Sequence, residues 1–266
     1  SADAVAEEVD VYLNDVLLLD NFAFRTATPF VDVQAGVDFT VSIVPANSTS
    51  VDDAIVDFTY NLPANSKFIL VANGIVSAEG YSPSIGFDIY PYGMGREVAT
   101  NASNTDVLVF HGSTDAPEVT VWEIGAGAGE LFTFEYGDFA GYLELPTADY
   151  VLDIRAGGES VVAYSAPLAS LGLDGAALTV LASGFLNPAA NSDGPAFGLF
   201  VALATGGDLV ALPVYVEPTP MARLQVIHNS ADLAAASVDV FVNGDLFIPD
   251  FGFRTATPFV DVPAEV

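Results

Sequence analysis

The chain has 266 residues, of which 52% are hydrophobic, and its 35 Asp and Glu against 6 Lys and Arg give a formal net charge of −29. This charge excludes nucleic acid and anionic bilayers as natural partners, because both require a basic footprint on the protein. No apolar run approaches the ~18 residues that a membrane helix needs, so we predict no membrane span in this segment. The apolar residues are therefore expected in buried strands.

The length suffices for two ordinary domains with full cores. Cysteine is absent, so the chain has neither disulfides nor thiol chemistry. The sequence begins at Ser1 without Met, a basic segment or an apolar segment, and we expect any secretion signal to lie outside it.

Turn residues interrupt the sequence about every eight to twelve residues, as they do in a β-sandwich. In chain order, residues 39–43 alternate between apolar and polar, and residues 68–72 form a nearly continuous apolar run. Residues 150–154 alternate again, and residues 177–181 form a second continuous run. Alternation predicts strands with one solvated face, whereas the continuous runs predict central strands that are covered on both sides.

The two ends of the chain carry the same sequence. Residues 230–266 repeat residues 1–37 without a gap at an offset of 229, with 22 of the 37 positions identical. Residues 25–33 recur unchanged as residues 254–262. Repetition with such a long period indicates an array or a fibre rather than an active site.

A fainter similarity divides this period into two domains. Residues 107–115 align with residues 224–232, and residues 182–184 align with residues 72–74. We therefore predict an all-β chain of tandem antiparallel β-sandwich domains in a repeat array. Its expected parts are a domain that lacks its first strand (1–105), a complete domain (106–216), a Pro-rich linker (217–221) and the opening strands of the next domain (222–266, repeating 1–37).

Short motifs follow one another in a fixed order along the chain. They are a strand that ends in His and a turn that ends in Asp (residues 224–232), Val-Asp-Val-Phe-Val-Asn-Gly (238–244), Phe-Gly-Phe (251–253) and Pro-Ala (263–264). This order resembles a bacterial and archaeal family of extracytoplasmic domains of unknown function, number 4397. The resemblance implies an Ig-like sandwich on a secreted or surface protein, and it implies no activity.

One motif, His-x-Ser-x-Asp, contains residue types that are used in nucleophilic catalysis. It occurs at His111 and Asp115 and again at His228 and Asp232. Nucleophilic catalysis needs a base, a group that orients the base and an oxyanion pocket, which one short turn seldom provides. Strand alternation points each His inward, where the carboxylate four residues later is expected to bond the imidazole and pin the turn. A metal ligand and a catalytic group are the alternatives, and we do not expect an enzyme.

Acidic clusters are a second candidate site. Calcium needs about six to eight oxygens gathered in one loop, and no Asp-x-Asp-x-Asp-Gly run supplies them. We expect a solvated acidic face and no cofactor, with weak Ca²⁺ binding between units as the alternative. The clusters are Glu7, Glu8 and Asp10; Asp52, Asp53 and Asp57; and Asp149 with Asp153.

The identical segments 25–33 and 254–262 contain Arg25 with Phe30 and Arg254 with Phe259. The plain interpretation is core packing, with each Arg bonding loop carbonyls or a carboxylate. The alternative places these segments at a contact between domains, where Phe and Arg are favoured anchors.

We expect a structural protein, a repeat unit of an extracellular filament, matrix fibre or adhesin stalk whose partners are copies of itself or adjacent repeats. In one route the chain is an excerpt of a longer polypeptide. In the other, subunits join head to tail, and the strand with Leu224, Val226 and His228 completes the neighbour's first domain. A surface adhesin or a carbohydrate-binding or ligand-binding module is the alternative, although Trp122 is the single Trp.

Overall fold

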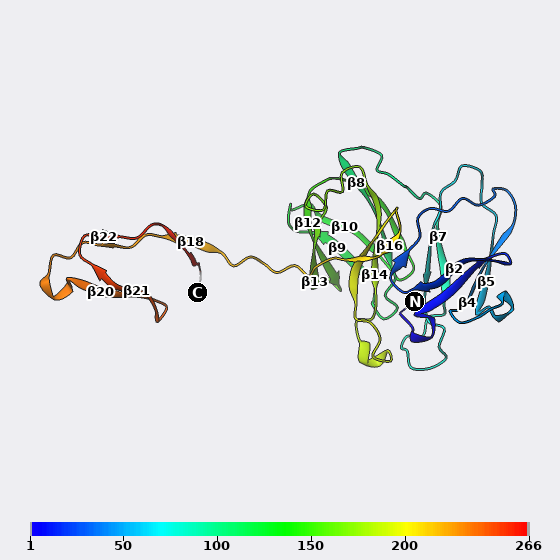
Figure 1. The fold of residues 1–266 in the computed structure, drawn as a ribbon, viewed down its shortest axis with the longest axis horizontal. Helices are drawn as coiled ribbons and strands as arrows, with labels where there is room; N and C mark the ends of the chain where they lie inside the picture. The colour runs from blue at the N-terminus through cyan, green and yellow to red at the C-terminus, as the bar shows by residue number, and fades with distance from the viewer. Residues whose placement is uncertain (1, 265–266) are drawn as a thin grey trace. The chain divides into compact units, whose positions relative to one another are not determined.

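The computed structural model describes residues 2–264 as strands, turns and short 3-10 helices, so the expected all-β class is confirmed. The chain divides into two compact units, Ser1–Tyr215 and Val216–Val266 (Figure 1). The first unit holds two β-sandwich domains, named here the open domain (residues 2–98) and the closed domain (residues 104–215). None of the helices among the described residues is long and apolar enough to cross a membrane.

The open domain has a four-stranded antiparallel sheet in the order β2-β1-β4-β5 and a separate antiparallel pair, β6 with β7. Ile89 of the pair packs on the apolar face of the sheet with Val9, Val11 and Val41, and this contact forms the core. The elements are η1 (Ala4–Ala6), β1 (Glu8–Leu13), β2 (Val16–Ala23), β3 (Thr26–Ala27), β4 (Phe39–Pro45), η2 (Val51–Asp53), β5 (Val56–Tyr60), β6 (Ile69–Asn73) and β7 (Asp88–Tyr92).

The closed domain packs a four-stranded sheet, β10-β9-β12-β13, on a five-stranded sheet, β11-β8-β14-β15-β17. Its elements are β8 (Asn104–His111), β9 (Val119–Glu123), β10 (Gly129–Phe134), β11 (Phe139–Pro146), β12 (Asp149–Ala156), β13 (Glu159–Pro167), β14 (Ala177–Ser183), η3 (Pro188–Ala190), β15 (Gly198–Leu203), β16 (Gly207–Asp208) and β17 (Val210–Ala211).

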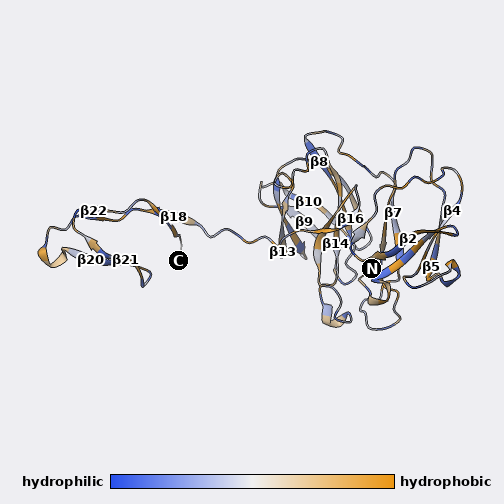
Figure 2. Ribbon diagram, viewed as in Figure 1, coloured by the Kyte–Doolittle hydropathy of each residue, from blue (hydrophilic) through white to orange (hydrophobic). Residues whose placement is uncertain are grey.

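Strand β8 is central to the closed domain. It pairs antiparallel with β11 on one edge and parallel with β14 on the other. Its residues Val107 and Val109 face the core between the sheets, where they join Val121 of β9 and Val180 of β14. Both hydrophobic and hydrophilic residues colour the strands of the two domains (Figure 2), as one-sided burial requires.

The two domains share their strand registers. Val9 lies opposite Phe22 in the open domain, and Val119 lies opposite Phe134 in the closed one. Gly74 after β6 and Gly184 after β14 both have positive φ, 107° and 91°, and a Cβ at either position would collide with a carbonyl oxygen of a neighbouring segment. A glycine is therefore required at both turns.

Aromatic side chains join the open and closed domains. Tyr90 of β7 packs on Phe110 with ring centroids 5.3 Å apart, and Tyr92 packs on Phe139 at 5.1 Å. The Arg96 guanidinium bonds the buried carboxylate of Asp106 at 2.6 Å. These contacts explain why the two domains form one compact unit.

The second unit contains a hairpin, β20 with β21, and two short pairs, β18 with β23 and β19 with β22. Among residues 216–264, only His228 and Phe251 are buried, so this unit has no hydrophobic core of its own. Its elements are β18 (Met221–Leu224), β19 (Ile227–His228), η4 (Leu233–Ala235), β20 (Ser237–Val242), β21 (Asp245–Gly252), β22 (Thr255–Ala256) and β23 (Val260–Pro263).

Candidate assembly site

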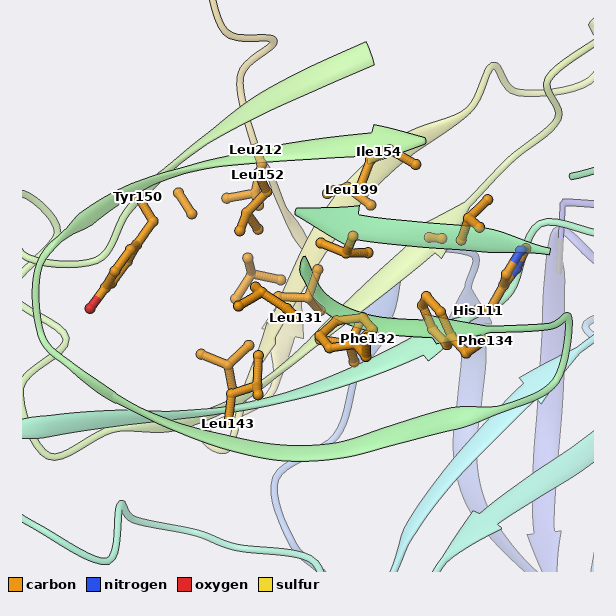
Figure 3. Close-up of a pocket in the computed structure, with 18 of the residues that line it drawn as sticks. His111, Leu131, Phe132, Phe134, Leu143, Tyr150, Leu152, Ile154, Leu199 and Leu212 are labelled. Carbon is orange, nitrogen blue, oxygen red and sulfur yellow. The ribbon is translucent and has the colours of Figure 1, made fainter. Parts of the chain in front are cut away.

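An open groove of about 750 Å³ penetrates the open domain and extends to the outer face of the closed domain's five-stranded sheet. Val11 and Val41 of the first sheet line it together with Leu70 of β6, and Thr179 and Leu181 of β14 face it from the closed domain. In the closed domain, by contrast, the space between the sheets is reduced to a cavity of about 50 Å³. Figure 3 shows the side chains that fill this space.

The difference lies in one strand. In the closed domain β8 occupies the place between β11 and β14, whereas no described residue of the open domain forms its counterpart next to β6. Leu70 of β6 is consequently 37% exposed, although Val180, its equivalent in β14, is 5% exposed. Residues 68–72 were expected to be covered on both sides, but β6 is an edge strand, because among the described residues it pairs only with β7.

The segment 25–33 adopts a different structure from its identical copy 254–262. In the second unit, Val260–Pro263 forms β23 and pairs with β18. In the open domain, residues 28–34 belong to no strand, and β3 just before them pairs with β16 of the closed domain. A partner strand therefore decides whether this sequence becomes a strand.

The strand residues predicted for assembly lie in the second unit. Leu224, Val226 and His228 are more buried than the residues between them, in agreement with the predicted inward alternation. The His228 ring lies near Phe251 and Phe253, at centroid distances of 6.1 and 6.3 Å. Their strand is paired along one edge, because among the described residues β18 and β19 pair only with β23 and β22.

Arg25 connects the open domain to the closed one. Its guanidinium donates to the hydroxyl and the carbonyl of Ser183 and to the carbonyl of Ala196, and it stacks on Phe200 at 3.7 Å. Burial lowers its pKa below the ordinary value. The sequence left two interpretations open, an Arg that bonds loop carbonyls and a contact between domains. Arg25 fits both, because the loop carbonyls that it bonds belong to the closed domain.

The copies of this segment have different environments. Arg254 stacks on Phe253 at 4.9 Å and is exposed. Phe30 is half-buried along the open groove, whereas Phe259 is 58% exposed beside Arg223.

The expected bond between His and Asp forms at neither turn, and that part of the prediction is wrong. His111 Nε2 lies 3.1 Å from the carbonyl oxygen of Pro117, and His228 Nε2 lies 2.7 Å from that of Ala235. The carboxylate of Asp115 is turned away, toward the loop after β14, and that of Asp232 accepts from the backbone N–H of Ala234. The four-residue spacing places each carboxylate beyond the imidazole. The ring therefore forms its hydrogen bond with a nearby backbone carbonyl instead.

The carboxylates of Asp115 and Asp3 accept hydrogen bonds from distant loops, a role that the sequence did not predict. Asp115 accepts the N–H groups of Leu186 and Asn187, at 2.9 and 2.8 Å. Asp3, the equivalent residue of the open domain, accepts those of Val76 and Ser77, at 2.8 and 2.6 Å. Each Asp therefore fastens its own turn to a loop about seventy residues away. The signal for this role was the recurrence of the turn sequence, as Ser-Ala-Asp at residues 1–3 and 230–232 and as Ser-Thr-Asp at residues 113–115.

Several acidic residues considered for calcium have structural partners instead. Asp10 is buried and accepts from the N–H of Asn21, and Asp153 is bonded by Arg155 and Ser160. Asp149 accepts from Ser170, and Asp53 from Ser48. Within residues 2–264 no three His, Asp or Glu side chains are grouped so that they hold a metal ion.

Residues 1–88 match the model of DUF4397, a domain of unknown function. This stretch therefore carries a DUF4397 domain. The match ends inside β7, so it covers nearly all of the open domain. No curated protein matches the chain.

His111 supplies a first test of these roles. Its ring is fully buried against Phe134, and burial lowers the pKa of the imidazole below 6.5, although the hydrogen bond to Pro117 opposes the shift. We expect His111→Ala to destabilise the first unit by about 3 kcal/mol, because it leaves a cavity and an unpaired carbonyl. Thermal unfolding measures the loss, and His228→Ala, in the second unit, is the matched control.

The same ring gives a pH dependence. Because the folded pKa lies below the unfolded one, the wild-type chain loses stability as the pH falls from about 6.5 toward the folded value. His111→Ala should remove this part of the pH profile. An unchanged midpoint together with an unchanged profile would contradict a structural role for the ring.

Proposed function

We propose that this chain is a structural repeat unit of an extracellular filament, matrix fibre or adhesin stalk. Its open domain is completed by a strand that comes from the neighbouring repeat or subunit, and assembly is head to tail. The observation that carries the proposal is the open groove. A β-sandwich that leaves an apolar strand uncovered beside a cavity of about 750 Å³ is half of an interface.

Three further features support a structural role. The closed domain supports the proposal, because β8 lies between β11 and β14 there and the cavity between its sheets has only about 50 Å³. The contact is heterologous, because the donor strand and the groove lie in different parts of the chain, and such contacts propagate into linear assemblies. The net charge of −29 suits a surface in salt, where the repulsion between neighbouring copies is screened.

Assembly of the chain tests this proposal. We expect the purified protein to form linear, concentration-dependent oligomers as salt rises, visible by sedimentation velocity and negative-stain electron microscopy. A tandem protein in which residues 1–229 precede residues 1–266 tests the version with one long polypeptide. Small-angle scattering should show a stiff rod for it. Monomers at every salt concentration, together with a tandem protein whose copies tumble independently, would refute the proposal.

A further inference from the structure

We propose that the open groove is the seat of the strand Met221–His228 of a second copy of this chain. In this seat the strand lies parallel to β6 and antiparallel to residues 26–33. The inference rests on the proposed function and specifies its partner, its register and its residues.

The closed domain fixes the register on the parallel side. There Leu178 of β14 lies opposite Val107 of β8, and Ala182 lies opposite His111. The sequence equivalents of these β14 residues are Phe68 and Ala72, and those of the β8 residues are Leu224 and His228. The inserted strand therefore runs beside residues 68–72 from Leu224 to His228, and Val226 lies opposite the exposed Leu70.

The antiparallel side is fixed twice. In the closed domain Val107 lies opposite Leu143, which is equivalent to Val31. In the second unit Leu224 itself lies opposite Val260, whose position in the identical segment is also that of Val31. Two independent pairings thus place Leu224 of the donor opposite Val31 of the acceptor.

The side chains of the donor fit this seat. Leu224, Val226 and His228 already alternate inward in the second unit, and in the groove they meet the apolar side chains that line it. Arg223 bonds Asp261 at 3.3 Å, and Asp261 corresponds to Asp32. The same ion pair is therefore available across the copies.

The exchange of partners favours assembly energetically. When the strand leaves residues 254–262 of its own chain for residues 25–33 of the second copy, it meets a partner of identical sequence. The antiparallel hydrogen bonds on this edge are therefore equivalent before and after the exchange. What is new is the parallel pairing with β6 and the burial of the apolar groove, so the exchange is driven by interactions that the donor lacks in its own unit.

A fused strand tests the seat. Placing residues 221–229 directly before Ser1 recreates the native junction, because Asn229 is followed by Ser-Ala-Asp in the second unit, as the chain begins. We expect this autocomplemented chain to unfold about 5 °C or more above the wild type, since it gains the missing strand. A fused strand with Leu224→Asp and Val226→Asp is the matched control, and it should give no increase.

A labelled peptide of residues 220–229 tests the same seat in trans. We expect it to bind the full chain and to bind the autocomplemented chain at least about tenfold more weakly. The two opposing results are equal binding to both chains, which would place the peptide elsewhere, and binding to neither. Either one overturns the seat, while linear assembly of the wild-type chain would leave the proposed function standing.

Because the chain contains no cysteine, single engineered thiols test the register between copies. Mixed Leu224→Cys and Val31→Cys chains should form an intermolecular disulfide on mild oxidation. The same donor mixed with Val33→Cys, two residues along the same face, should form much less. Equal yields, or none with Val31→Cys while assembly persists, would overturn the register.

Discussion

Arg25→Ala is expected to lower the free energy of unfolding of the first unit by about 2–4 kcal/mol and its thermal midpoint by about 5–10 °C. The substitution removes the donor for three oxygens of the closed domain and the guanidinium that stacks on Phe200. Arg25→Lys should retain the charge but lose the forked geometry, and we expect an intermediate midpoint. Differential scanning calorimetry measures both variants.

The chain supplies its own control for this experiment. Arg254 occupies the same position in an identical nine-residue segment, but its ring contact is with its neighbour Phe253 and its side chain is exposed. Arg254→Ala should therefore change the midpoint of the first unit by less than about 1 °C. Equal losses in the two variants would show that the effect belongs to the sequence of the segment and not to the contact between domains.

Asp3→Asn is expected to cost about 2–4 kcal/mol, because an amide nitrogen replaces an oxygen that accepts hydrogen bonds in a fully buried place. Asp3 accepts from the backbone N–H groups of Val76 and Ser77 and from the Ser77 hydroxyl. Asp232→Asn is the control, since its exposed carboxylate accepts one N–H. Denaturant unfolding measures the loss of stability in both variants. A loss of similar size in Asp232→Asn would contradict the role of Asp3 in holding the loop that contains Val76 and Ser77.

Acid should act through the same carboxylate. Burial would raise the pKa of Asp3, but the hydrogen bonds from Ser77, Val5 and Val76 outweigh it and hold the pKa below 3.8. Burial likewise opposes a lower pKa of Glu123, and the N–H groups of Ala126, Ala128, Val151 and Gly125 outweigh it. The stability that these groups contribute is complete above their unfolded pKa values and is lost as the pH falls through the folded ones. The unfolding midpoint of Asp3→Asn should therefore fall less between about pH 6 and pH 2 than that of the wild type.

The fold class was predictable because alternation and turn spacing are local properties of a sequence. Val107, Val109 and His111 alternate inward as expected, and so do Leu224, Val226 and His228. The exposure of residues 68–72 was not predictable from their composition. An apolar run indicates that a strand is suited to a buried environment, but it does not indicate which strand lies beside it. In this structure β6 pairs only with β7 among the described residues.

The partners of the turn residues were missed for a related reason. Proximity in the sequence favoured a bond between His111 and Asp115, but the carboxylate reaches Leu186 and Asn187. Those contacts exist only once β8 and β14 lie side by side. The position of Arg25 was easier to anticipate, because an unchanged segment in an otherwise diverging pair of copies indicates a constrained environment, although the oxygens it bonds could not be named.

The exposed edge of β6 also determines how the protein must avoid unwanted aggregation. An uncovered apolar strand edge pairs with any suitable strand, and proteins protect such edges with short strands and charged neighbours. Here β6 has five residues, and Lys67 just before it is held by Glu97. The net charge of −29 repels other copies of the chain over a range that salt shortens. Dilute, low-salt conditions should therefore disfavour pairing of this edge with strands of other chains, and higher ionic strength should favour it.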